Sequence, residues 1–312
     1  MFDSPVSASA YEVLRVEATA DQETLRRAYR LRLRETHPDT GGDAALFIQV
    51  QRAWELVGEP DARAAYDRGH GFGQHARASY EPDAPAWRPP RPSSDTRPRA
   101  RSHGHPGGWR RERYLMLMRE WVGRGVDLDD PYDPALVRSA PLHIRRLLAD
   151  ALAEEATARI VSDLGMGYTV WHDVMASGRD ADPDAKIDHI VLGPSGLYGI
   201  LSDDFGGPVR IRRGELIGDG VVGTPIRSLL ARMRVVARAA RVRFSGAIVV
   251  LPDDDVLDPI QEIGRVRGMP VAVVSRNALS TVLRRGLTGV RPIGGTEVFD
   301  VRTRLQHTVR FA

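Results

Sequence analysis

The sequence predicts a multidomain protein with a small all-α domain, a disordered Pro/Arg/Gly-rich linker, and a larger α/β domain with a mixed sheet. Three observations lead to this prediction. Apolar residues recur at helical spacing within residues 1–70, proline and arginine replace apolar residues over 71–110, and short apolar runs alternate with helical stretches over 141–312. We expect residues 111–140 to form a helical connector. At 312 residues the chain has room for two domains of ordinary size.

Composition excludes several kinds of chemistry. The chain contains no cysteine, which excludes disulfides, thiol catalysis and thiolate zinc sites. It begins without a basic segment followed by an apolar core, and no apolar run approaches the roughly 18 residues that a membrane span needs. We therefore expect a soluble cytoplasmic protein with no membrane contact. The formal charge of +3 is modest, so the overall charge does not by itself indicate an anionic partner.

Two sequence patterns mark helix starts in the first domain. Each places a hydroxyl residue three positions before a Glu or Gln whose side chain can reach back, which is the spacing of a capping box. These patterns are Ser9–Glu12 and Thr19–Gln22. Helices are therefore expected near residues 10–15 and 20–36.

Proline and aspartate define the remaining helices of this domain. Pro38 has no amide to donate and disfavours helical angles at the residue before it, so the second helix must stop there. Asp43 can cap a third helix over about 44–58. A fourth helix opens at Pro60, because proline suits the first helical position. The first domain is thus expected to contain four helices with a polar loop between the second and the third.

The second predicted helix has a basic face that leads to the tripeptide His37-Pro38-Asp39. Arg26, Arg30 and Arg34 are spaced four apart and share one face. Arg27 flanks them, and such a face can steer association with an acidic partner surface. Taken alone, the arginines are better explained as a solvated helix face. The tripeptide at the end of the same helix favours a binding role.

The segment from about Ser9 to Arg68 resembles the J-domain of DnaJ-like co-chaperones. The resemblance rests on His37-Pro38-Asp39, the preceding Tyr29-Arg30, and the closing Arg63-Ala64-Ala65-Tyr66-Asp67. It implies a domain that recruits a DnaK-type ATP-dependent chaperone and stimulates its ATP hydrolysis, without catalytic residues, a metal or a cofactor of its own. By the same resemblance, the chaperone-binding residues are Arg26, Arg27, Arg30, Arg34, His37, Pro38 and Asp39.

The predicted linker is rich in arginine. Residues 71–115 contain nine arginines against four acids. Such a segment can contact nucleic acid or an acidic protein surface. A solvated spacer explains the composition more simply, so nucleic acid is a conceivable partner but not the favoured one.

The second domain is predicted from apolar runs separated by turns and helices. Helices are expected near 114–122, 141–164, 225–240 and 276–285. Strands are expected at 168–172, 186–192, 197–201, 209–212, 247–251 and 271–274. The run Gly193–Gly196 is a strong turn signal between the second and third of these strands. This pattern is typical of an α/β fold.

The hairpin Lys186–Tyr198 is similar to the nuclease-related domain called NERD, which has the restriction-endonuclease-like fold. That family uses a helix acid, a hairpin Asp and a Glu-x-Lys motif, because two carboxylates hold Mg²⁺ and a lysine assists the attack. By this resemblance, Glu155 matches the helix acid and Asp188 the hairpin acid. Leu201 and Asp203 stand where the family has Glu and Lys.

These replacements predict a degenerate nuclease site made of Glu155, Lys186, Asp188, Leu201 and Asp203. A leucine cannot ligate magnesium and an aspartate cannot supply a cation. A rearranged Mg²⁺-dependent nuclease is the alternative, because Lys186 and Asp188 share one strand face and Asp203 or Asp204 can replace the missing ligand.

The sequence as a whole favours a co-chaperone whose C-terminal domain is an adaptor for an unfolded client or a specific partner protein. Two alternatives stay open. One is a nuclease tethered to a chaperone-recruiting module, and the other is an adaptor that binds nucleic acid.

Overall fold

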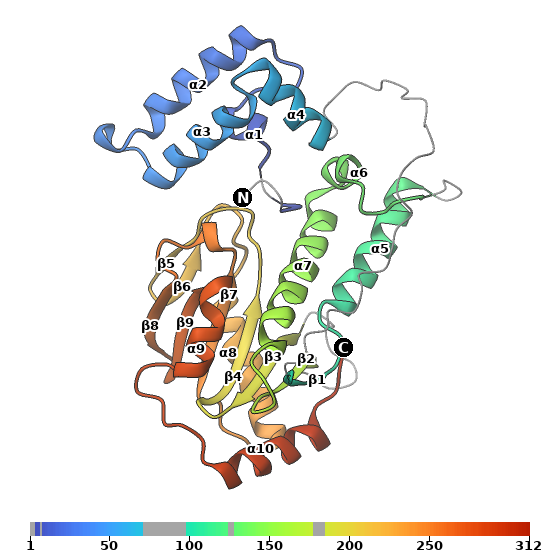
Figure 1. The fold of residues 1–312 in the computed structure, drawn as a ribbon, viewed down its shortest axis with the longest axis vertical. Coiled ribbons are helices and arrows are strands. Elements are labelled where there is room, and N and C mark those ends of the chain that lie inside the picture. Colours follow the sequence, from blue (N-terminus) through green and yellow to red (C-terminus); the bar gives the residue numbers. More distant parts are fainter. Residues whose placement is uncertain (1–3, 7, 71–97, 124–127, 177–184) are drawn as a thin grey trace. The chain divides into compact units, whose positions relative to one another are not determined.

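The computed structural model describes residues 4–6, 8–70, 98–123, 128–176 and 185–312 (Figure 1). The chain divides into two compact units. One comprises Ala8–Arg97 and Tyr132–Leu136, and the other comprises Met1–Ser7, Pro98–Pro131 and Val137–Ala312. The linker predicted for 71–97 lies outside the described residues. Among the helices that the structure describes, none is both long and apolar enough to cross a membrane.

The first unit is all-α, as predicted. Its elements are α1 (Ala10–Leu14), α2 (Gln22–Thr36), the 3₁₀ turn η1 (Pro38–Thr40), α3 (Ala44–Val57) and α4 (Pro60–His70). Ser9 forms the predicted capping box with Glu12. The start of α2 differs from the prediction, because Asp21 rather than Thr19 is the N-cap and accepts a hydrogen bond from the amide of Thr24 at 2.8 Å.

Polar contacts connect the two ends of this helical unit. Tyr11 on α1 is fully buried, and its hydroxyl donates to Asp67 at 2.5 Å and accepts from Arg63 at 3.0 Å. The Tyr66 hydroxyl accepts from the amide of Ala10 at 2.9 Å. The Arg63–Asp67 motif therefore fixes α4 against α1, which gives this part of the sequence a folding role.

The second unit contains a seven-stranded mixed sheet in the order β1-β2-β3-β4-β7-β9-β8. The central β2, β3 and β4 are antiparallel, β4, β7 and β9 are parallel, and β8 pairs antiparallel with β9 at the edge. The bounds are β1 Arg101–His103, β2 Thr169–Met175, β3 Lys186–Gly193, β4 Gly196–Ser202, β7 Gly246–Leu251, β8 Ile260–Val266 and β9 Met269–Ser275. A separate hairpin is formed by β5 (Arg210–Arg212) and β6 (Glu215–Ile217).

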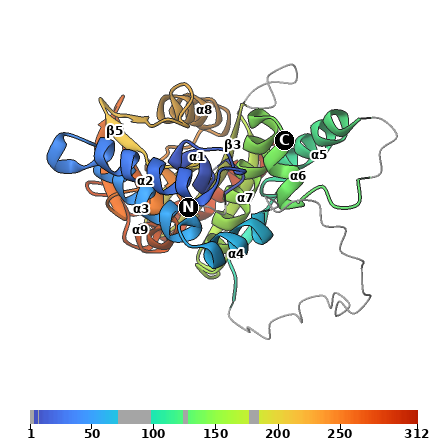
Figure 2. The ribbon, with the colours of Figure 1, turned by 90° about the horizontal axis from the view of Figure 1, so that it is seen from above.

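Helices cover both faces of this sheet. The helices of the second unit are α5 (Gly108–Val122), α7 (Leu142–Ser162), α8 (Pro225–Ala240), α9 (Leu279–Arg285) and α10 (Gly295–Thr308), and α6 (Pro134–Ser139) spans the division between the two units. The views in Figures 1 and 2 place α7 and α9 on one face and α8 on the other. Two apolar cores result. One packs α8 and α10 on the sheet, and the other packs α7 and α9 on it. The predicted mixed-sheet α/β architecture is confirmed.

The described part of the predicted linker is structured, which corrects the boundary at residue 110. Residues Arg101–His103 form β1, which pairs with β2 in parallel, and α5 begins at Gly108. The stability of β1 comes from a partner strand about 70 residues away, so local composition does not reveal it. The elements β6, β8 and α10 were also not expected. For β8 the reason is that it lies at the sheet edge and most of its residues are exposed, so its sequence contains no apolar run.

Candidate functional site

The tripeptide loop of the first unit is exposed and internally hydrogen-bonded. The backbone of His37 is extended, which ends α2, and its Nδ1 accepts a hydrogen bond from the Asp39 amide at 3.2 Å. The imidazole contacts Phe47 edge-on, with ring centroids 5.0 Å apart. The side chain of Asp39 is 89% exposed and that of His37 is 41% exposed. Both polar side chains are therefore accessible to a partner.

Two glycines give this loop its shape. Gly41 has a φ of +83°, which residues with a side chain rarely adopt. A Cβ at Gly42 would lie 2.3 Å from the carbonyl carbon of Thr36, so no larger residue fits there. Their amides donate to the carbonyls of Pro38 and His37 at 3.0 and 2.9 Å. The loop is therefore held in one conformation before any partner binds.

The basic face predicted for α2 is present and exposed. Arg26, Arg27, Arg30 and Arg34 are all classed as exposed on this helix. The Arg30 guanidinium donates back to the carbonyl of Arg26 at 3.3 Å. The structure therefore places four cationic side chains on the helix that ends at the His37–Asp39 loop, which is the arrangement expected from the sequence.

Comparisons with known proteins concern this same region. Residues 9–67 match the family model of the DnaJ domain. This chain is 46% identical over 61 residues to the chaperone protein DnaJ of Thermosynechococcus vestitus, covering 19% of this chain and 16% of that protein. It is 42% identical over 78 residues to the DnaJ of Cereibacter sphaeroides, covering 22% and 20%. It is also 41% identical over 59 residues to a tetratricopeptide repeat and J domain-containing co-chaperone, DNJ1, of Mycosarcoma maydis, covering 19% and 10%.

Residues 9–67 are therefore a J-domain. The chain spans only about a tenth to a fifth of the length of these relatives. The aligned part covers 19–22% of this chain in these three relatives.

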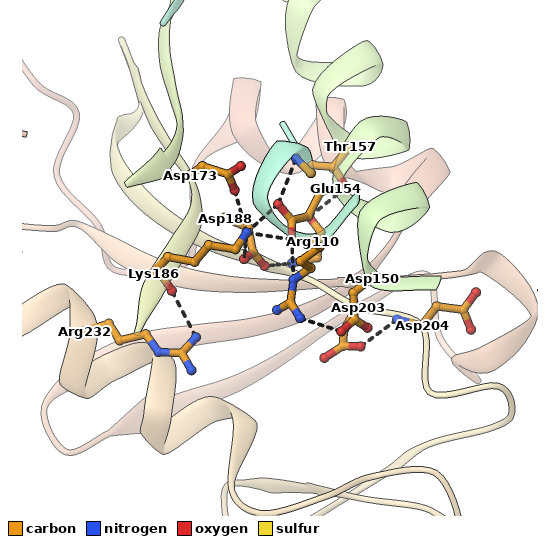
Figure 3. A network of polar contacts seen from close by, with 12 residues as sticks. Arg110, Asp150, Glu154, Thr157, Asp173, Lys186, Asp188, Asp203, Asp204 and Arg232 are labelled. Atoms are coloured by element: carbon orange, nitrogen blue, oxygen red, sulfur yellow. Dashed lines mark hydrogen bonds and ion pairs between the residues drawn. The ribbon is translucent and has the colours of Figure 1, made fainter. Parts of the chain in front are cut away.

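The second unit contains a buried ion network centred on Lys186 of β3 (Figure 3). The ammonium lies 2.6 and 2.7 Å from the two carboxylate oxygens of Glu154, 2.5 Å from Asp173 and 3.2 Å from Asp188. All four side chains are almost completely buried. The ammonium thus occupies the space between three carboxyl groups from α7, β2 and β3.

The helix acid of this network is Glu154, which corrects the prediction of Glu155. The side chain of Glu155 points elsewhere, is 31% exposed and accepts from the Nε of Arg111 at 2.7 Å. One residue along a helix rotates a side chain by about 100°, so the two neighbours cannot share a face. The buried stripe Asp150, Glu154, Thr157 and Val161 has helical spacing, and this spacing could have identified Glu154.

A second cation, Arg110, extends the network and was not predicted. Its Nε lies 2.6 Å from Glu154 and its Nη1 lies 2.6 Å from Asp150. The amide of Gly107 also donates to Glu154 at 3.1 Å. Arg110 falls at the end of the expected linker, so only the fold of α5 against α7 reveals its role.

Leu201 and Asp203 lie at the end of β4, on either side of Ser202. The Leu201 side chain belongs to the apolar core. Between them, the amide of Ser202 donates to Asp188 at 2.9 Å. The carboxyl of Asp203 faces Asp150 (Figure 3), and burial together with Asp150 raises its pKa well above the usual range. Because two such carboxyls lie together, we expect them to share a proton.

The network fixes the charge of its central groups. Burial alone would lower the pKa of Lys186, but Asp188 and Glu154 reverse the effect and raise it above its usual value. Burial alone would raise the pKa of Asp188, but Lys186 and Arg110 lower it below its usual value. Lys186 and Asp188 are therefore ionised as a pair. In the part of the chain that the structure describes, no group of three His, Asp or Glu side chains is arranged to hold a metal ion.

A cleft of about 770 Å³ lies beside the network. Its walls come from α5, α7, the end of β4 and the start of α8. Apolar residues such as Leu147 and Phe205 line it together with Arg146, Asp150 and Arg232. Concave sites with apolar walls and a few polar groups are typical of ligand or peptide binding. This cleft was not predicted, because its residues are far apart in the sequence.

Proposed function

We propose that this protein is a co-chaperone whose J-domain recruits a DnaK-type ATP-dependent chaperone and stimulates its ATP hydrolysis. The main observation is the exposed His37–Asp39 loop at the end of an α2 helix with four exposed arginines. The relatives that match this segment are named as DnaJ chaperones and a co-chaperone, which supports the same role. The proposed site of action is the cytoplasm.

The residues of this surface have separate roles in the proposal. Arg26, Arg27, Arg30 and Arg34 steer the encounter with an acidic groove on the chaperone. His37 and Asp39 make the polar contacts after docking. Pro38 and the hydrogen bonds of the loop keep these side chains in place, so little conformational entropy is lost on binding.

The second unit is proposed as an adaptor for an unfolded client or a specific partner protein. The cleft of about 770 Å³ provides a concave surface with apolar and charged groups. We also propose that this unit is a degenerate form of the nuclease-related domain used for binding, with Glu154 in place of Glu155 as the helix acid.

Reversing two charges on α2 is expected to weaken chaperone binding. In Arg26→Glu with Arg30→Glu, the affinity should fall and its dependence on ionic strength should decrease, because exposed charges act mainly through long-range attraction. Binding is measured by titration with the DnaK-type chaperone at several salt concentrations. The double variant Arg113→Glu with Arg119→Glu on α5 changes the net charge equally and should bind like the wild type. An unchanged salt dependence in the α2 variant would mean that its arginines are only a solvated face.

A Mg²⁺-dependent nuclease is the second candidate, because the fold brings Lys186, Asp188 and Glu154 together. We expect no Mg²⁺- or Mn²⁺-dependent cleavage of DNA or RNA by the purified chain. The ammonium of Lys186 already occupies the space between these carboxyl groups, and Leu201 supplies no ligand. Losing such groups typically costs several kcal/mol of transition-state stabilisation, which leaves cleavage close to background.

The control for this assay is Asp188→Asn, checked for folding by circular dichroism. A contaminating nuclease would cleave equally in the wild-type and variant preparations. Metal-dependent cleavage that disappears in a folded Asp188→Asn variant would overturn the prediction and establish the second unit as an enzyme.

A further inference from the structure

Positive charge is concentrated around α8. Residues 208–246 contain nine arginines against two acids, an excess of +7. The whole chain has a formal charge of +3, so the remaining residues have a net charge of −4. The modest overall charge therefore conceals one strongly basic segment, and α8 itself contains no acidic residue.

The arginines of this segment form a ridge on the outer face of α8. Arg227, Arg234 and Arg238 are seven and four residues apart, so they share one helix face, and Arg241 follows at the C-cap. All four are exposed. The opposite face, with Leu229, Leu230, Met233 and Val236 among others, packs into the core against the sheet. At 1.5 Å per residue the ridge extends about 21 Å.

The two acids of this basic segment do not pair with the ridge arginines. The buried carboxylate of Glu215 accepts from the amides of Ile226 and Arg227 at 2.8 and 3.1 Å, so it caps the helix instead of pairing with an arginine side chain. Asp219 is the other acid of the segment. Within the described residues, none of the four ridge arginines forms an ion pair.

The β5–β6 hairpin extends the basic surface at the start of α8. Glu215 belongs to β6, and its hydrogen bonds to the first amides of α8 hold the hairpin against the helix. Arg212 and Arg213, immediately before Gly214, are exposed at the turn of this hairpin. These two arginines add positive charge near the start of α8, outside the ridge itself.

The ridge has no evident folding role. Like charges four residues apart, such as Arg234 and Arg238, destabilise a helix. A surface that lowers folding stability and lacks compensating acids is better explained by a partner of opposite charge. Guanidinium groups can bind phosphates with two parallel hydrogen bonds, which makes arginine well suited to that partner.

We propose that the α8 ridge, defined as Arg227, Arg234, Arg238 and Arg241, binds the phosphate backbone of nucleic acid without reading its sequence. No Asn or Gln, the residues that typically recognise adenine, occurs on α8. Membrane binding would require an exposed apolar helix face, but the apolar face of α8 is buried against the sheet. A protein interface usually has aromatic or apolar residues at its centre, whereas the centre of this ridge is formed by arginines and Ala231, and the exposed Val235 lies to one side. This inference is independent of the docking proposed for the J-domain.

The salt dependence of nucleic-acid binding tests this inference. The binding of a labelled DNA duplex to the full chain is measured by fluorescence anisotropy at about 50 to 200 mM salt. In a plot of log affinity against log salt concentration, each neutralised phosphate contributes about −0.9 to the slope. Four arginines predict a slope of about −3.6, and Arg234→Gln with Arg238→Gln should make it about 1.8 less steep. The charge-matched control Arg26→Gln with Arg30→Gln in the J-domain should leave the slope unchanged.

Three results would overturn the proposal. The first is the absence of binding to both DNA and RNA, double- or single-stranded, at the lowest salt. The second is binding that the folded Arg234→Gln, Arg238→Gln variant retains in full. The third is binding only to vesicles containing phosphatidylglycerol, or only to a polyglutamate peptide, because the ridge would then have a different class of partner. Circular dichroism of each variant confirms that it is folded.

Discussion

Replacing His37 by glutamine is expected to remove the stimulation of ATP hydrolysis by the DnaK-type chaperone. The imidazole is accessible, and its Nδ1 orders the loop by accepting from the Asp39 amide. Glutamine keeps a polar group but not the ring that contacts Phe47. Loss of a central interface contact costs about 2 kcal/mol or more, so stimulation should fall by at least about tenfold. The measurement is single-turnover ATP hydrolysis by the chaperone.

The same substitution at an exposed histidine of the second unit, His105→Gln, serves as the control and should stimulate like the wild type. Circular dichroism should show the same helical content in both variants, because His37 lies in the loop and not in the core. Full stimulation by a folded His37→Gln variant would contradict the assignment of the loop as the docking site.

The largest effect on stability is expected from Lys186→Met. The ammonium contacts Glu154, Asp173 and Asp188 inside the second unit, and methionine fills similar space without charge. Breaking a buried ion pair by removing one partner typically costs about 3–5 kcal/mol, because the remaining charges are left uncompensated. The free energy of unfolding, measured with urea, should decrease by about that amount. Arg285→Met is the control, since Arg285 pairs with Glu262 at the surface and is 57% exposed.

The loss in Lys186→Met should also depend on pH. Burial raises the pKa of Glu154 well above its usual range even beside the ammonium, whereas Lys186 helps to lower the pKa of Asp188. Without the ammonium, we expect burial to raise the pKa of Asp188 as well, above its value in the unfolded chain. The folded variant then keeps protons that the unfolded chain releases, so the variant becomes less stable as the pH rises. The deficit relative to the wild type should therefore be larger at about pH 8 than at about pH 5. A deficit that is equal at both pH values would show that lost packing, and not charge, causes it.

The sequence predicts the helical unit well because its signals are local. Ser9 with Glu12, Pro38 and Pro60 each act on neighbouring backbone groups, and the observed ends of α1, α2 and α4 follow them. The N-cap of α2 differs because Asp21, two residues after Thr19, competes for the same amides. A carboxylate at this position is the better cap.

The sheet unit is predicted less completely because part of it depends on distant partners. The buried strands β3, β4, β7 and β9 appear as apolar runs, whereas β1 and β8 are stable only because they pair with β2 and β9. The ion network shows the same limit. Lys186 and Asp188 are recognisable by their spacing on one strand. Arg110, which pairs with Glu154, and Asp173, which pairs with Lys186, join the network only in the folded chain.

The basic ridge on α8 shows how an average hides a local feature. The overall charge of +3 gave no indication of a polyanionic partner. Helical spacing, together with the burial of the opposite face, reveals that Arg227, Arg234 and Arg238 lie on one exposed face. The arginines of the predicted linker suggested a similar partner by composition alone, without a defined geometry.

The central claim is that this chain acts on a DnaK-type chaperone through its J-domain. The most direct measurement is the single-turnover rate of ATP hydrolysis by that chaperone, with and without the full-length wild-type chain. We predict that the rate rises with the concentration of the chain and reaches saturation, because docking at one site limits the effect. A rate that is unchanged at every concentration, with a chain whose circular dichroism shows it to be folded, would contradict the claim.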